Sequence, residues 1–261
     1  MYPEIHIGPI TLQTFGLMFA LAFLSAGWLI AKRLKEIGKP VDWAYEMGFA
    51  ALIGGVVGSR LYFIVENYDS VKDDLLGNLF SGAGLVWYGG AIGGALGVLL
   101  WAWYRGFLGL ALLDLAAPAL ALGYAVGRIG CQLSGDGDYG KAWDGPWAMS
   151  YPDGTVPTTE KVHPTPVYET LVMGFGAFVL WQLRDRLRAG ILFALYLLYA
   201  GAERFLVEFL RRNDEVALGL TTAQFESLGM IAAGAVWIYV VKRRHGTLSI
   251  RVFQAKEASS G

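Results

Sequence analysis

The stretch that decides the fold is Ile10–Ile30, which reads ITLQTFGLMFALAFLSAGWLI and contains no charged side chain. About 20 apolar residues are enough for a helix to cross the roughly 30 Å hydrocarbon core of a bilayer. The stretch is too long for a signal peptide, and it lacks a preceding basic segment and a small-residue cleavage site. It therefore predicts a membrane-spanning helix that stays in the protein.

Further apolar segments follow along the chain, and they lie at Ala44–Val65, Ala83–Tyr104, Leu110–Ile129, Val167–Leu183, Ile191–Leu210 and Ala223–Val241. Together with the first stretch they predict about seven transmembrane helices in a single polytopic domain, residues 1–261, of an all-α integral membrane protein. Glycine pairs such as Gly89-Gly90 lie inside these segments. Small residues there let membrane helices approach closely.

Composition supports this class and excludes several others. The chain is 55% hydrophobic and 16% charged, with 9 Trp, 13 Tyr and 14 Phe, whereas soluble domains are about 25% charged and disordered chains are poor in aromatic residues. The 21 Lys and Arg residues are offset by 22 Asp and Glu. Without a basic excess to neutralise phosphates, we expect no nucleic-acid partner. A single cysteine, Cys131, excludes an internal disulfide and a multi-cysteine metal site.

Orientation follows from the loops, because Lys and Arg stay on the cytoplasmic side. Loops after odd-numbered spans and the tail hold Lys32, Arg33, Lys35, Lys39, Arg105, Arg184, Arg186, Arg188, Lys242, Arg243, Arg244, Arg251 and Lys256; the opposite side holds Lys72, Lys141, Lys161, Arg211 and Arg212. We therefore expect the N-terminus outside and the C-terminus in the cytoplasm. Residues 131–166 then form a small irregular outer-face head between spans four and five, and residues 242–261 form a cytoplasmic tail. The other outer loop, 66–82, carries Asp69, Asp73 and Asp74.

Three arginines fall inside or at the edge of the predicted spans, each toward the outer end: Arg60, Arg128 and Arg204. A charge at the bilayer centre costs at least roughly 2.5–3.5 kcal/mol, so such residues are functional candidates. An arginine fork matches phosphate oxygens in bidentate fashion. Glu208 lies four residues after Arg204, on the same helical face, and can orient its guanidinium. The pattern predicts a phospholipid headgroup site, and the alternative is a set of buried ion pairs that hold helices together.

A polar, glycine-rich segment, GRIGCQLSGDGDYG, spans residues 127–140 where the fourth span ends. Its glycines predict tight turns. Asp136 and Asp138 suit a hard cation, but two acids without further ligands do not define a site, and we expect no metal. Cys131 follows Arg128 by three residues, which would favour a reactive thiolate, although a free cysteine commonly acts as a small hydrophobe.

The chain as a whole resembles the prolipoprotein diacylglyceryl transferase family, as a divergent member. The segments that carry the resemblance are residues 127–140, HPTPVYE at 163–169, RFLVEFLR at 204–211, Ile7-Gly8-Pro9 leading to residues 15–18, GSRLY at 58–62, Asp114 and Tyr88-Gly89-Gly90. Their order and spacing extend over nearly the whole chain. No single segment is specific alone.

The resemblance implies transfer of the diacylglyceryl group of phosphatidylglycerol to the lipobox cysteine thiol in a preprolipoprotein signal peptide. A thioether forms and glycerol phosphate leaves, without a cofactor. The resemblance also places the enzyme among the lipids of the bacterial cytoplasmic (inner) membrane, with its active site toward the outer face. Implied catalytic residues are Arg128, Arg204 and Tyr88. Implied substrate-binding residues are Arg60, Asp114, Cys131, Ser134, Asp136, Asp138, Gly89, Gly90, His163, Glu169 and Glu208.

This sequence departs from the family pattern at groups that manage protons and hydroxyls. Tyr88 stands where the family usually has histidine, and Cys131 and Ser134 replace asparagines. The usual glutamate becomes Asp136 or Asp138, and the usual tyrosine becomes Phe15. An inactive or repurposed phospholipid-binding paralogue is therefore the main alternative, followed by a transporter and a membrane scaffold. His163, which precedes Pro164 and Pro166, is an alternative base or fixes the entry to span five.

Overall fold

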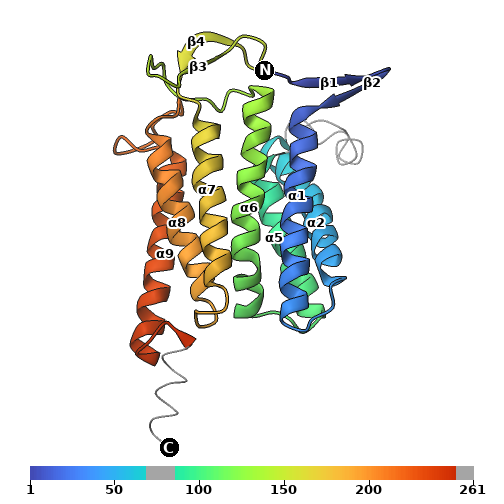
Figure 1. Ribbon diagram of the computed structural model, residues 1–261, viewed down its shortest axis with the longest axis vertical. Coiled ribbons are helices and arrows are strands. Elements are labelled where there is room, and N and C mark those ends of the chain that lie inside the picture. The colour runs from blue at the N-terminus through green and yellow to red at the C-terminus, as the bar shows by residue number, and fades with distance from the viewer. Residues whose placement is uncertain (69–85, 251–261) are drawn as a thin grey trace, which may run out of the picture. The chain divides into compact units, whose positions relative to one another are not determined.

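The computed structural model describes residues 1–68 and 86–250, and these are mostly helical (Figure 1). Within the described ranges the helices are α1 (Thr14–Glu36), α2 (Trp43–Glu66), α5 (Trp87–Tyr104), α6 (Leu110–Ser134), α7 (Thr165–Leu183), α8 (Ile191–Glu208) and α9 (Thr222–His245). Each of the seven predicted spans overlaps one of these helices. The outer-loop acids Asp69, Asp73 and Asp74 and the last residues of the tail, 251–261, lie outside the described part of the chain.

Length and apolar composition suit several of the helices to a bilayer. Of the helices described, α1, α2, α6 and α9 have 23 to 25 residues and are apolar enough to cross a membrane. The helices α5, α7 and α8 have 18 or 19 residues. Together these features indicate a multi-pass membrane protein.

The described residues also form four short strands. The all-α prediction did not include these strands. β1 (Glu4–Ile7) pairs antiparallel with β2 (Ile10–Gln13), and β3 (Met149–Tyr151) pairs antiparallel with β4 (Thr158–Val162). The prediction that the first span begins at Ile10 is wrong, because residues 10–13 alternate apolar and polar side chains, a strand pattern, and pair with β1. The helix itself begins at Thr14 and continues to Glu36.

The fourth span also ends later than predicted. α6 extends to Ser134 rather than Ile129, so Cys131–Ser134 form its last turn instead of the start of the irregular head. The chain leaves the helix at Gly135, whose φ of +59° lies in the left-handed region that favours glycine. The connection between α6 and α7 is therefore residues 135–164. At the other end of the chain, α9 continues to His245, so the predicted tail begins as helix.

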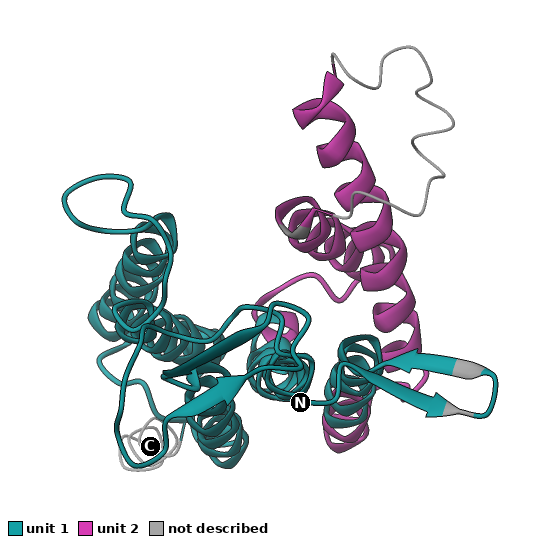
Figure 2. Ribbon diagram, turned by 90° about the horizontal axis from the view of Figure 1, so that it is seen from above, with its two compact units in different colours: residues 1–29, 113–261 teal, residues 30–112 magenta. Residues whose placement is uncertain are grey.

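The structure divides into two compact units, Met1–Leu29 with Leu113–Gly261, and Ile30–Leu112 (Figure 2). In the second unit, α2 and α5 pack through glycines. A Cβ at Gly54 would overlap the carbonyl oxygen of Gly93, and one at Gly93 would lie 2.7 Å from the Cα of Gly58. These glycines allow backbone-to-backbone packing, which confirms the close-packing interpretation of this part of the glycine excess.

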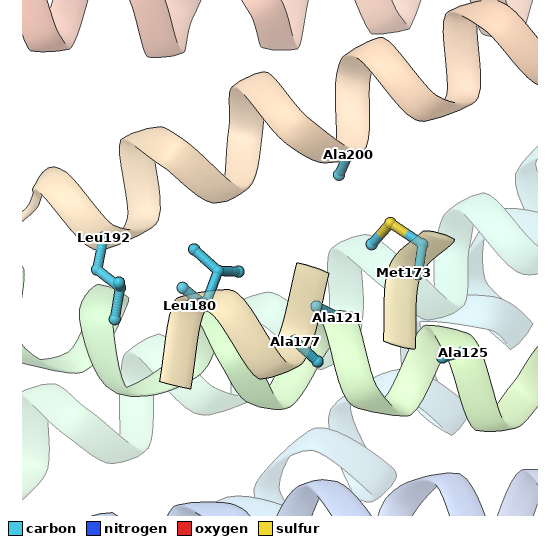
Figure 3. Packing of buried hydrophobic residues seen from close by; sticks show 8 residues of the cluster. Ala121, Ala125, Met173, Ala177, Leu180, Leu192 and Ala200 are labelled. Atoms are coloured by element: carbon cyan, nitrogen blue, oxygen red, sulfur yellow. The ribbon is translucent and has the colours of Figure 1, made fainter. Parts of the chain in front are cut away.

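In the first unit, α6, α7 and α8 share an apolar core of mostly small side chains (Figure 3). Its buried members are Ala117, Ala121 and Ala125 of α6, Met173, Ala177 and Leu180 of α7, and Leu192 and Ala200 of α8. The core members Ala125, Met173 and Ala200 lie about one helical turn from Arg128, Glu169 and Arg204, respectively. The packed helices thereby bring these three charged side chains to one end of the core.

Candidate active site

Glu169 of α7 lies at the centre of a cluster of arginines. Its side chain is 0% exposed, and Arg128 Nε lies 3.2 Å from its Oε2. Arg204 Nη1 lies 3.5 Å from Oε1, and Arg211 Nη1 lies 3.6 Å from Oε2. One buried carboxylate thus faces three guanidinium groups that come from α6, from α8 and from the segment after α8.

Tyr124, one turn before Arg128 on α6, supports the same carboxylate. Its hydroxyl donates to Glu169 Oε1 at 2.8 Å and accepts from Arg128 Nη2 at 3.0 Å. The Arg128 guanidinium also lies over the Tyr124 ring, 4.9 Å from its centroid. Because both ends of the guanidinium are held, Arg128 has a fixed direction in the cluster.

Asp138, in the connection between α6 and α7, pairs with Arg128 and with Arg211. Burial opposes its ionisation, but the two arginines outweigh that effect and lower the pKa of its carboxyl below the usual value. Asp136 instead accepts a hydrogen bond from the backbone N–H of Asp138 at 3.2 Å. Of the two acids that the sequence left open, Asp138 is therefore the one that contacts the arginines.

Glu208 anchors the α8 side of the cluster. Its Oε2 lies 2.8 Å from Arg204 Nη2, which confirms the predicted pair at i and i+4. Its other oxygen accepts from Asn213 Nδ2 at 2.6 Å and from Thr221 Oγ1 at 2.9 Å. Thr221 is the N-cap of α9, so the same carboxylate ties the end of α8 to the start of α9.

The charges of this cluster balance, yet two arginine nitrogens make no hydrogen bond within the described part of the chain. Asp138, Glu169 and Glu208 offset Arg128, Arg204 and Arg211 in number. Arg204 Nη1 and Arg211 Nη1 are buried and donate no hydrogen bond to any residue in the described part of the chain. Both lie at ion-pair distance from Glu169. Rigid guanidinium groups with spare donors can receive the oxygens of an anionic ligand without rearranging.

Two other predicted residues of α6 lie beside the cluster. The buried thiol of Cys131 lies 3.7 Å from Arg128 Nη1. Ser134 is buried, and its hydroxyl donates to the backbone oxygen of Cys131 at 3.4 Å. Its own backbone oxygen accepts from Thr155 N at 2.8 Å. Ser134 thus holds the connection against the end of α6.

Asp114 lies far from the cluster, at the opposite end of the helices. Its two oxygens accept from the backbone N–H groups of Gly190 and Phe193 at 2.7 and 3.0 Å, where α8 begins. Phe193 precedes Arg204 by eleven residues, about 16 Å along a helix. The contacts of Asp114 are those of a residue that caps a helix, and they give no support to its predicted contact with the substrate.

His163 lies in an aromatic group before α7. Its ring stacks on Trp143 with centroids 4.3 Å apart, and its Nδ1 lies 3.3 Å from the hydroxyl oxygen of Tyr168. Burial lowers the pKa of its imidazole. The backbone of His163 pairs with Gly140 and Lys141, which fits the predicted role in fixing the entry to α7.

The remaining predicted residues belong to the second unit. Arg60 is buried on α2, and Tyr88 in the first turn of α5 is 42% exposed. Gly89 is buried, and a Cβ there would overlap Gly58 and Tyr62. Gly90 lies where a Cβ would be 3.6 Å from the backbone oxygen of Gly55.

Comparison with known proteins identifies the family. A sequence model described as "Prolipoprotein diacylglyceryl transferase" matches residues 4–240. The chain belongs to the prolipoprotein diacylglyceryl transferase family. Relatives named phosphatidylglycerol–prolipoprotein diacylglyceryl transferase include one from Clostridium tetani (strain Massachusetts / E88), 35% identical over 88% of this chain and 92% of its own length. Another, from Methylobacillus flagellatus (strain ATCC 51484 / DSM 6875 / VKM B-1610 / KT), is 34% identical over 92% of this chain and 95% of its own.

In this member of the prolipoprotein diacylglyceryl transferase family, sequence reasoning missed Tyr124 and Arg211 as parts of the cluster. The charge distribution of the loops assigns Arg211 to the outer side, although its spacing of seven residues from Arg204, two turns of a helix, indicates the same face. The backbone explains its place: Arg211 forms an isolated bridge with Gly140. A Cβ at Gly140 would lie 2.9 Å from that of His163, so this close approach requires glycine.

Proposed function

We propose that this protein transfers the diacylglyceryl group of phosphatidylglycerol to the lipobox cysteine of a preprolipoprotein. The proposal combines family membership with one observation: two buried arginine donors without hydrogen-bond partners in the described structure, held in place by Glu169. In the reaction, the thiolate sulfur attacks the glycerol carbon that carries the phosphate, and a thioether forms. The carbon–oxygen bond breaks, its electron pair stays on the phosphate oxygen, and glycerol phosphate leaves.

The arginines stabilise the leaving group. Charge develops on the phosphate as the bond breaks, and fixed cations away from bulk water stabilise that change more than they would in water. Arg204 and Arg211 offer donors to the phosphate oxygens, and Arg128 adds positive charge from α6. Asp138, Glu169 and Glu208 hold these guanidinium groups in position. For Arg60 and Tyr88, in the other unit, the proposed lipid-binding roles rest on the family resemblance alone.

An apolar cavity gives the lipid a path from the bilayer. It has a volume of about 330 Å³ and lies between α7 and α8, where its lining includes Phe175, Gly176, Leu183, Leu195 and Tyr199. Phe175 is six residues after Glu169, about 9 Å along α7. A lipid whose phosphate lies at the arginines can therefore place an acyl chain along the same pair of helices, as sideways entry from the membrane requires.

The proposed topology follows the charge distribution of the loops. The seven helices span the bacterial inner membrane as one domain, residues 1–261, with the N-terminus outside and the C-terminus in the cytoplasm. Residues 135–164 then belong to the outer-face head and residues 242–261 to the cytoplasmic tail. The arginine cluster lies next to the connection between α6 and α7 and so faces outward, where lipobox cysteines emerge.

A defined transfer reaction tests the proposal. Purified protein in phosphatidylglycerol-containing nanodiscs is mixed with a lipobox peptide, and mass spectrometry follows addition of the diacylglyceryl group. We expect product from the wild type, a loss of about 10²–10³-fold in Arg204→Gln, and little change in the control Arg243→Gln, which alters an exposed arginine of α9. Wild-type protein that binds phosphatidylglycerol but yields no product up to pH about 9 would instead be the phospholipid-binding paralogue.

A further inference from the structure

Glu203 is a buried acid that the arginine cluster does not use. It lies on α8 immediately before Arg204 and is 9% exposed. Glu169 and Glu208 are held by ion pairs and hydrogen bonds. No hydrogen bond or ion pair joins Glu203 to a residue in 1–68 or 86–250. An ionisable group inside a membrane helix is costly without a partner, and this makes Glu203 a candidate for a role in the reaction.

The surroundings of Glu203 place it next to the phosphate site. Glu203 interacts electrostatically with Tyr124 and Arg128 of α6 and with Glu169 of α7. On α8 it follows Tyr199 by one turn and directly precedes Arg204, and it interacts electrostatically with both. Arg211 also interacts with it electrostatically. Tyr199 lines the apolar cavity. Glu203 thus lies on α8 directly before Arg204 of the cluster and one turn after Tyr199 of the cavity proposed for the acyl chain.

We infer that Glu203 accepts the proton of the incoming cysteine thiol, an inference that rests on the proposed function. The reaction needs a thiolate, and a free thiol has a pKa of about 8.5, so a base is required near neutral pH. Glu203 takes the thiol proton as the sulfur–carbon bond forms and the carbon–oxygen bond breaks. The departing glycerol phosphate then receives that proton, and the carboxylate is restored.

With this assignment, the proton acceptor of the reaction is Glu203 and not Tyr88. A phenol with a pKa of about 10 is mostly protonated at neutral pH and so can donate a hydrogen bond but rarely accept a proton. A carboxylate held by no ion pair or hydrogen bond within the described structure can accept one. Glu203 therefore serves as the catalytic base, and Tyr88 keeps the role of orienting the lipid.

The test compares the pH dependence of Glu203→Gln with that of wild type in the peptide transfer reaction. The glutamine is nearly isosteric and uncharged, and the matched control is Glu226→Gln, which alters an exposed acid on α9. At pH 7 we expect Glu203→Gln to lower kcat about 10²–10⁴-fold with phosphatidylglycerol binding retained. The loss should shrink as pH rises above about 8.5, because the thiol then ionises by itself.

Each outcome of this test either supports or overturns the role of Glu203 as the base. A pH-dependent loss that recovers at high pH supports the assignment, because a structural defect would lower activity by the same factor at every pH. Active wild type with equal activity in Glu203→Gln overturns the role of Glu203 alone. A recovering loss in Tyr88→Phe but not in Glu203→Gln assigns the base to Tyr88 and also overturns the inference. Wild type without product overturns the proposed function itself, together with this inference. Should Glu203→Gln fail to fold, Glu203→Ala takes its place, and activity in that variant that equals wild type, or is lower by the same factor at every pH, would contradict proton transfer by Glu203.

Discussion

Replacing Glu169 by glutamine removes the one carboxylate that faces all three guanidinium groups. Asp138 and Glu208 remain, so the buried cluster changes from balanced to an excess of one positive charge. Breaking a buried ion pair by removing one partner typically costs about 3–5 kcal/mol, because the other charge stays buried and uncompensated. Glu169 is completely buried, so solvent screening does not reduce this effect. We expect Glu169→Gln to lose about that much stability.

Thermal unfolding in detergent measures this loss. By the scaling for soluble chains of 150–250 residues, 3–5 kcal/mol corresponds to a fall in Tm of about 6–20 °C. A double-mutant cycle with Arg211→Gln then isolates the pair, and we expect a coupling energy of about 0.5–3 kcal/mol. Glu226→Gln serves as the exposed control. An unchanged Tm in Glu169→Gln, or a coupling energy near zero, would refute the view that Glu169 organises the arginines.

Three further predictions concern residues outside the cluster. Burial lowers the pKa of His163, so as the pH falls the unfolded chain takes up a proton at this residue first, near pH 6.5. The stability that His163 contributes is therefore complete above that pH and declines below it. Between pH 7 and 5, Tm should fall less in His163→Phe than in wild type. Gly93→Ala introduces a Cβ that overlaps the backbone of α2 and should cost about 1–3 kcal/mol in thermal unfolding, whereas Gly48→Ala, with nothing within 4 Å of its Cβ, should not destabilise. Asp114→Ala should cost about 0.5–2 kcal/mol through the lost helix cap and leave kcat per folded protein unchanged; a specific loss of kcat would restore Asp114 to the substrate site.

The sequence predicts those parts of the site that depend on local periodicity. The pair of Arg204 and Glu208 follows from helical spacing alone, and the helices follow from long apolar segments. The strand at Ile10–Gln13 is missed because a window that counts apolar residues does not separate a short amphipathic strand from the helix that follows it. Local patterns therefore give helices and pairs within one helix.

Contacts between distant segments are not visible in such patterns. Asp138 rather than Asp136 reaches the arginines because of the turn at Gly137, whose φ is +96°. Arg211 joins the cluster through its backbone bridge to Gly140. Asp114 caps a helix whose N-cap residue, Gly190, lies 76 residues later in the chain. Each of these contacts depends on how separate elements pack, which no local pattern of residues specifies.

The most direct test of the central claim is a structure of the protein with phosphatidylglycerol bound. The account predicts that phosphate oxygens lie about 2.7–2.9 Å from the spare nitrogens of Arg204 and Arg211, with Glu169 still behind both guanidinium groups. A phosphate bound elsewhere in a protein that carries out the transfer would contradict it.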